Sequence, residues 1–233
     1  MNKIDININN IIEKFERKLK NTGWEPIFKT FFESEIFQTV IYKLKDEAEN
    51  DRRFTPKLKD IFNSFIYCPY DKLKVIIIGQ DPYPQINVAD GISFSCSYTN
   101  KEQPSLRYIF DELQQQYPNS SRDTDLKRWS EQGVLMLNTA FTVQIGKIGS
   151  HYELWKPFTH HILQSINRDF KKLPVALLGK KAEEWQIRLD SQNIMKVPHP
   201  ASAAYKGGKW DSKNLFININ DALKEQGNTM ISW

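Results

Sequence analysis

An acidic residue placed just after a short apolar run is the first candidate for chemistry in this sequence. The run Val75–Ile78 is followed by Gly79, Gln80 and Asp81, and then by Pro82. Glycine allows a tight turn, and the proline restricts Asp81 to extended backbone angles, which helps to fix its carboxylate. A fixed carboxylate can orient a water molecule or offset a developing positive charge. An Asp-Pro pair by itself is more typical of a turn, so the surrounding elements decide its meaning.

Four short apolar runs, each ending in a polar cluster, are the elements that must position this chemistry. The runs are Val75–Ile78, Val134–Leu137, Val175–Leu178 and Ile194–Val197, and the clusters after them contain Asp81, Asn138, Gly179-Lys180 and His199. Runs this short without strict alternation are typical of strands buried on both faces in a parallel sheet. The stretches that separate them include helical patterns over Leu106–Gln116, Trp155–Phe170 and Ala182–Leu189. The sequence therefore predicts an α/β fold, a three-layer sandwich whose central, mostly parallel four-stranded sheet is flanked by helices. In such folds the clusters meet beyond the carboxyl ends of the strands, where ligands bind.

The N-terminal part carries helical patterns and no candidate chemistry. Apolar residues at helical spacing predict a helix over residues 4–19, and a broad apolar face predicts a second over Phe28–Lys45. A polar stretch over Asp46–Lys59 follows. Because no repeat, low-complexity linker or long Pro/Gly hinge divides the chain, we expect one domain over residues 1–233. It comprises a helical segment over 1–50 and a motif-bearing region over 54–233.

Composition excludes several classes of protein. The 233 residues are 40% hydrophobic and 26% charged, which is typical of a globular chain. No apolar stretch approaches the roughly 20 residues of a membrane helix, and the polar start is unlike a signal peptide. Two cysteines, Cys68 and Cys96, exclude a disulfide scaffold or a cysteine-rich zinc site. We therefore expect that the protein is not secreted. It should be cytoplasmic or, in a eukaryotic or viral setting, nuclear.

The net charge of +4 permits binding to nucleic acid without arguing for it. Between Lys196 and Lys213, four lysines stand against one acid, so part of the surplus falls in one short stretch after the last strand. Such a stretch is more often a solvated loop.

A series of motifs in the same order, from about Phe54 to the C-terminus, resembles family 1 uracil-DNA glycosylases. The family string GQDPYHGPNQAHGLCFS aligns without a gap from Gly79 to Ser95, with identity at the first five positions. Further similarities follow along the chain, at Pro104-Ser-Leu106, Gly133–Val143, Gly149-Ser-His151, Gly179-Lys180, His199–Ser202 and Ile231-Ser-Trp233. One short motif is only moderately specific for this family, whereas a series of motifs in the same order strongly supports the resemblance.

The resemblance implies two catalytic residues. Asp81 is then the carboxylate that positions the attacking water and stabilises a cationic sugar, and His199 the neutral imidazole that hydrogen-bonds to the departing uracil oxygen. A lone histidine is more often structural, and we assign that role to His151, His160 and His161.

The resemblance also implies a base pocket. Phe94 would stack on the flipped base, Asn138 would read the uracil edge, Tyr83 would exclude a 5-methyl group, and the backbone N–H of Gln80 would bind a uracil carbonyl.

Contacts to DNA are expected from short loops that offer backbone N–H and hydroxyl groups to phosphates. The candidates are Pro104, Ser105, Gly179, Lys180, Ala201, Ser202, Tyr205 and Lys206, with Lys209 and Lys213 adding salt-dependent affinity. The implied substrate is uracil in single- or double-stranded DNA, acted on by a monomer without metal or cofactor, and the sequence names no inhibitor or replication partner.

Three departures from the family pattern stand out. Pro84-Gln85 replaces a His-Gly pair, which puts in question how the loop beside the pocket is held. Ala201 replaces a serine, so that Ser202 is the candidate to take over a phosphate contact. Ala203 occupies the position of a leucine that enters the gap left by the base. We hypothesise that Tyr205 acts as the wedge instead, or that no wedge exists.

Two other functions are alternatives to a uracil-DNA glycosylase. A DNA-binding or replication accessory protein on this scaffold, catalytically weak or inactive, shares the proline after GxDPY and the HPA triplet. The presence of Asp81, Asn138 and His199 argues against it, because binding alone needs no water-positioning carboxylate. An α/β nucleotide-binding enzyme would need a Gly-rich phosphate loop, which the sequence lacks.

Overall fold

A four-stranded parallel sheet forms the centre of the molecule. The computed structural model describes residues 8–205 and 208–233. The sheet has the strand order β3-β2-β5-β6, with every neighbouring pair parallel, and its strands are β2 (Val75–Gly79), β3 (Val134–Asn138), β5 (Val175–Leu178) and β6 (Ile194–Val197). The predicted α/β class and all four predicted strands are confirmed. The register pairs Gly79 with Asn138, so the two polar clusters that follow β2 and β3 start side by side.

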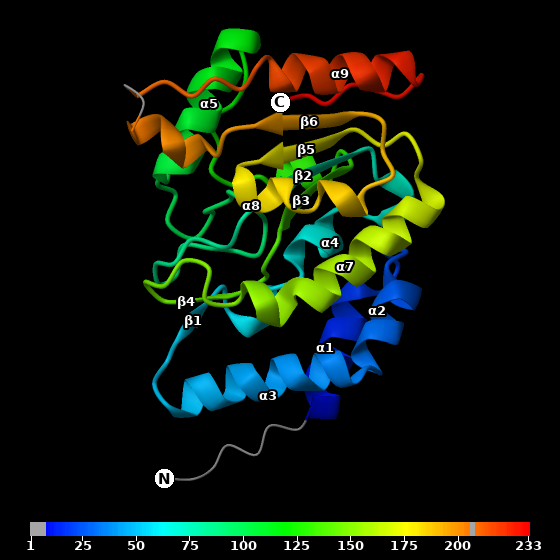
Figure 1. Ribbon diagram of the computed structural model, residues 1–233, viewed down its shortest axis with the longest axis vertical. Helices are drawn as coiled ribbons and strands as arrows, with labels where there is room; N and C mark the ends of the chain where they lie inside the picture. Colours follow the sequence, from blue (N-terminus) through cyan, green and yellow to red (C-terminus); the bar gives the residue numbers. More distant parts are fainter. Residues whose placement is uncertain (1–7, 206–207) are drawn as a thin grey trace.

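Helices cover both faces of this sheet, as Figure 1 shows. On one face pack α5 (Pro104–Gln116), α6 (Lys127–Ser130) and α9 (Leu215–Glu225). On the other pack α1 (Ile8–Leu19), α2 (Glu25–Phe32), α3 (Glu35–Glu49), α4 (Asn63–Tyr67) and α7 (Tyr152–Asp169). Alternate residues of each strand face the two layers of helices. In β2, Val75 and Ile77 face α5, α6 and α9, whereas Ile76 and Ile78 face the layer that contains α1 and α7. Burial on both faces explains the continuous apolar runs.

Three expectations need correction. The predicted helix over Phe28–Lys45 is two helices, because the chain breaks at Ser34, whose side chain caps α3 by accepting the N–H of Phe37. The predicted helix over Ala182–Leu189 is reduced to α8 (Lys180–Glu183) and a 3-10 turn over Gln186–Arg188. β6 is not buried along its length: Ile194 and Met195 are half-buried and Lys196 is exposed, whereas the other edge strand, β3, is mostly buried.

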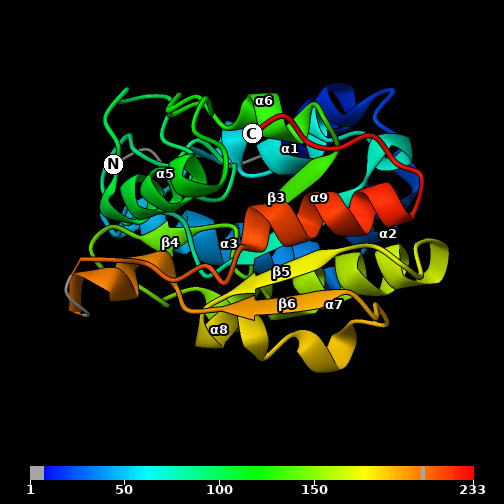
Figure 2. The same ribbon diagram turned by 90° about the horizontal axis from the view of Figure 1, so that it is seen from above.

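The carboxyl ends of the strands point to one side of the molecule. Figure 2 shows the arrows of β5 and β6 running toward the same end, where a 3-10 helix over Pro200–Tyr205 follows β6. A small antiparallel pair, β1 (Phe54–Thr55) with β4 (Val143–Gln144), lies apart from the main sheet and leads into the loop before α7. In the part of the chain that the structure describes, no helix is long and apolar enough to cross a membrane.

Candidate active site

A pocket of about 140 Å³ opens at the carboxyl edge of the sheet. Its lining includes all six residues that the sequence assigned to catalysis and base binding, namely Gln80, Asp81, Tyr83, Phe94, Asn138 and His199. Five of them lie in the loops after β2 and β6, and Asn138 is the last residue of β3; the parallel register brings these strand ends together. The expected convergence at this edge is therefore found, while the role of each residue stays a prediction.

Asp81 is held from one side by the backbone of a distant loop. The N–H of Gly149 donates a hydrogen bond of 2.7 Å to Oδ2 of Asp81, and the Tyr152 hydroxyl interacts with the same carboxylate more weakly. Burial raises the pKa of Asp81 above its usual value, and the hydrogen bond from Gly149 opposes that rise. The result is a carboxylate fixed in orientation, partly removed from water and facing the pocket.

His199 lies across the pocket in a state that favours donation. The N–H of Ala201 donates to Nδ1 of His199 at 3.2 Å, so a neutral ring carries its proton on Nε2. Burial lowers the pKa of His199 to about 4, which keeps the imidazole neutral at physiological pH. The side chain thus offers an N–H donor without a positive charge.

Gly179 sets the space behind His199. Its backbone has φ +91° and ψ 167°, a conformation essentially confined to glycine, and a Cβ there would lie 2.7 Å from Cβ of His199.

We expect Gly179→Ala to lower the free energy of unfolding by about 1–3 kcal/mol, because it adds backbone strain and a clash. It should also displace the His199 ring, visible as changed imidazole resonances. Gly227→Ala is the matched control, since Gly227 has φ +73° with nothing within 4 Å of an added Cβ. If neither Gly179→Ala nor the control changed the His199 imidazole resonances, Gly179 would not be what sets the space behind His199.

The ring of Phe94 forms a flat wall of the pocket, and its backbone has an unfavourable positive φ angle. It has φ +64°, which is unusual for an aromatic residue, and it is nearly buried. Its carbonyl accepts a hydrogen bond of 3.0 Å from the hydroxyl of Tyr83, and its ring lies 5.8 Å from that of His199. Strained backbone of this kind persists where the surroundings determine it, and here it turns the ring toward the cavity.

Asn138 is oriented by a residue that the sequence did not single out. The hydroxyl of Ser93 donates a hydrogen bond of 2.7 Å to Oδ1 of Asn138. Gly79 allows this approach, because a Cβ at that position would be 2.6 Å from Oγ of Ser93 and 3.0 Å from Oδ1 of Asn138. The Asn138 amide is thus fixed in one orientation, with its second lone pair and its NH₂ group left for a ligand.

Several predicted phosphate donors are already engaged within the protein. The N–H groups of Gly179, Ala201 and Ser202 donate to the carbonyl of Val197, the ring of His199 and the carbonyl of His199. These hydrogen bonds hold the loops around His199, and the roles of the three residues in DNA binding stay predictions.

The other predicted DNA contacts also stay predictions. Ser105 lines the pocket, Lys180 is exposed at the start of α8, and Pro104 has no N–H to give. The side chain of Tyr205 and all of Lys206 lie outside the described residues. Ala203 is buried in the core, which agrees with its being no wedge.

The departures near the pocket are also placed. Pro84 lines the cavity, and its carbonyl accepts the N–H of Gly146 at 2.9 Å, so the loop after β2 is tied to the loop before α7. Ile148 of that second loop reaches the rim and is 70% exposed. Gly149 had no sequence signal beyond its place in the Gly149-Ser-His151 motif, and Ile148 had none. Cys96 is buried and does not line the cavity.

The remaining titratable side chains form no metal centre in the described part of the chain, where no three His, Cys, Asp or Glu residues gather as ligands. His160 contacts Arg188, and His161 contacts the carbonyl of Ile27, which fits the structural roles expected for them. Cys68 and Cys96 are unpaired and buried.

Comparisons with known proteins agree with the geometry. The profile of the Uracil DNA glycosylase superfamily matches residues 65–224. A uracil-DNA glycosylase of Fusobacterium nucleatum is 35% identical over 220 residues, covering 91% of this chain and 95% of that protein. Uracil-DNA glycosylase 1 of Listeria innocua is 38% identical over 215 residues, covering 87% and 95%. The crystal structure of mimivirus uracil-DNA glycosylase superposes with a TM-score of 0.84 at 25% identity, covering 98% of this chain and 89% of that one.

Proposed function

The chain belongs to the uracil DNA glycosylase superfamily, and from that membership we propose that its edge pocket binds a uracil base flipped out of DNA and removes it by hydrolysis. It is a hydrolase of the DNA N-glycosylase class, and its activity is that of the first step in base-excision repair. The observation that carries the residue assignment is the placing of an oriented carboxylate and a neutral imidazole on one small pocket.

The reaction breaks the bond between N1 of uracil and C1′ of deoxyribose, and water supplies the new C1′–OH group. As the bond stretches, negative charge grows on the base and positive charge on the sugar. His199 would donate its Nε2–H to the base oxygen, where the charge develops, while Asp81 would stabilise the sugar cation and orient the water. His199 keeps its proton in this hydrogen bond, and the one proton that the water loses on forming the C1′–OH group neutralises the departing uracil anion. The products are free uracil and an abasic site in the DNA.

Selection of the base follows from the rest of the pocket. Phe94 presents a π-face that stacks on any base, so it supplies contact area without choosing. Asn138, fixed by Ser93, would pair with the O4 and N3–H edge that uracil shows and cytosine does not. Tyr83, anchored on the Phe94 carbonyl, would fill the space that the 5-methyl group of thymine needs.

The DNA around the base is expected to bind through hydroxyl and lysine side chains. Ser105 and Ser202 offer hydroxyl groups, whereas Lys180, Lys209 and Lys213 are exposed and would make the affinity depend on salt. A Tyr205 wedge remains part of this proposal. A variant of the mimivirus enzyme was crystallised in complex with UGI, and sensitivity to the same inhibitor is a proposal for this chain. We also propose that it acts as a single-domain monomer on single- and double-stranded DNA.

An excision assay tests the proposal directly. A uracil-containing oligonucleotide incubated with the protein and EDTA should yield free uracil and an alkali-labile abasic site, and the matching thymine and cytosine oligonucleotides should not. Tight DNA binding without release of uracil would instead identify a DNA-binding accessory protein.

We expect Asn138→Asp to lower selectivity for uracil over cytosine by at least about 100-fold, because a carboxylate accepts from the cytosine amino group and repels the uracil O4. Release of each base from matched oligonucleotides measures the ratio. Asn228→Asp, an exposed change of the same charge, is the control. Unchanged selectivity would remove Asn138 from base recognition.

A further inference from the structure

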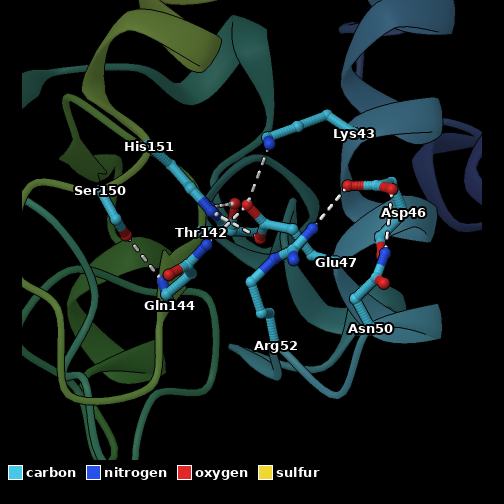
Figure 3. Close-up of polar contacts among 9 residues, drawn as sticks. All are labelled: Lys43, Asp46, Glu47, Asn50, Arg52, Thr142, Gln144, Ser150 and His151. Carbon is cyan, nitrogen blue, oxygen red and sulfur yellow. Dashed lines mark hydrogen bonds and ion pairs between the residues drawn. The ribbon is translucent and has the colours of Figure 1, made fainter.

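A buried carboxylate connects an N-terminal helix to the loop that holds Asp81. Glu47 lies on α3, before the region matched by the family profile, and its side chain is 1% exposed. Its Oε1 accepts a hydrogen bond of 2.7 Å from Nε2 of Gln144, and its Oε2 lies 2.9 Å from Nε2 of His151. Figure 3 shows Glu47 between these partners, which are 97 and 104 residues away in the sequence.

The hydrogen bonds around His151 fix its proton. The Glu47 carboxylate can only accept, so Nε2 of His151 faces it with a proton, and Nδ1 accepts from the hydroxyl of Thr142 at 2.8 Å. Oγ1 of Thr142 in turn accepts from Nε1 of Trp155 at 2.7 Å. Nε2 then carries the ring proton and donates it to Glu47. Burial lowers the pKa of His151, which favours this neutral ring. The positive charge facing Glu47 comes from Lys43, one turn earlier on α3 and 3.6 Å away.

The two donors to Glu47 stand at the two ends of one loop. Gln144 ends β4 and His151 immediately precedes α7. The N–H of Gln144 donates to Oγ of Ser150 at 2.8 Å, which closes the loop on itself. Between these ends, Gly149 donates its N–H to the carboxylate of Asp81. A displacement of either end therefore moves the group that orients Asp81.

We propose that Glu47 and His151 are positioning residues for Asp81, acting through the Gln144–Ser150 loop and the N–H of Gly149. The inference rests on the role of Asp81 in the proposed function and extends it to a helix outside the matched family region. Glu47 itself touches no reacting atom. Its carboxylate accepts from both loop ends at once, so the loop has one position and the Asp81 carboxylate one orientation.

The substitution Glu47→Gln tests the proposal, because an amide has only one oxygen and must turn its NH₂ group toward one of the two donors. We expect kcat for uracil release to fall by about 10- to 100-fold, as for a small misplacement of a reacting group, with KM nearly unchanged. Glu49→Gln is the matched control: it is the same change on the same helix, at an exposed residue paired with Lys45. The control should retain the wild-type kcat.

A second readout separates positioning from general damage to the fold. The Gly149 hydrogen bond lowers the pKa of Asp81, so weakening it should move the acid limb of the kcat profile to higher pH in Glu47→Gln. The other titratable groups facing this carboxylate are Tyr152 of α7 and, across the pocket, His199, and neither is changed.

Combination with Asp81→Asn gives the decisive comparison. If Glu47 acts through Asp81, adding Glu47→Gln to Asp81→Asn should cost far less than its effect in the wild-type chain. Full additivity, or a folded Glu47→Gln with wild-type kcat and pH profile, would overturn the inference while leaving the proposed function intact. A wild-type chain that releases no uracil would overturn both.

Gln144→Ala covers the case in which Glu47→Gln does not fold. It removes one donor and leaves the Glu47–His151 contact in place. A smaller loss of kcat with the same shift of the acid limb is expected, and no change in either would contradict the inference.

Discussion

Asp81→Asn is expected to lower the single-turnover rate of uracil release by about 10²- to 10⁴-fold, the range for losing a positioned acid–base group. The amide has the same shape as the carboxylate, and its oxygen can still accept a hydrogen bond from the Gly149 N–H. In the wild-type chain this N–H donates to Oδ2 of Asp81 at 2.7 Å. The substitution removes the negative charge that, in the proposed mechanism, offsets the sugar cation and orients the water. The loss should therefore fall on the chemical step and leave DNA affinity nearly unchanged.

The pH dependence of the wild-type rate gives the same assignment a second check. Burial raises the pKa of Asp81, so the active carboxylate is lost as the pH falls, at a higher pH than for an exposed aspartate. The excision rate should rise as the pH passes through the pKa of Asp81 and then level off. Asp81→Asn should abolish this rise in the pH range where His199 is neutral. Asp71→Asn, at an exposed position, should leave both rate and profile unchanged. A folded Asp81→Asn that excises at the wild-type rate would remove Asp81 from the chemistry.

The sheet and the meeting of Asp81, Asn138 and His199 could be predicted from local sequence signals, whereas Gln80, Tyr83 and Phe94 were assigned from the family resemblance. Each strand is a short apolar run, and each run ends in its own polar cluster, so parallel pairing alone brings Asp81, Asn138 and His199 to one edge. The break at Ser34 was missed because apolar residues continue on both sides of it, although a serine before a glutamate is a helix-start signal.

Contacts over long sequence separations could not be predicted in this way. The Gly149 N–H meets Asp81 68 residues away through backbone, which leaves no side-chain pattern to find. Glu47 looks from the sequence like one more charge on an amphipathic helix, and only the fold shows that it is buried against His151. The N–H of Gly179, which donates to the carbonyl of Val197, is another backbone contact that leaves no side-chain pattern in the sequence.

His199→Ala should lower the rate of uracil release by about 10²- to 10³-fold, as for the loss of one donor to a developing negative charge. The ring has a pKa of about 4 and its Nδ1 accepts the Ala201 N–H, so in the proposed mechanism its Nε2–H would donate to the departing base. Replacement by alanine removes that donor and leaves the Asp81 carboxylate in place. His160→Ala is the control, because His160 contacts Arg188 away from this pocket.

A change of leaving group distinguishes this role from a structural one. 5-Fluorouracil carries negative charge more readily than uracil and differs from it by a fluorine that is much smaller than a methyl group, so it should need less help from His199. The loss caused by His199→Ala should therefore be smaller for 5-fluorouracil, whereas the loss caused by Asp81→Asn, which acts on the sugar, should be similar for both bases. Equal losses for the two bases in His199→Ala would mean that the imidazole does not stabilise the departing base.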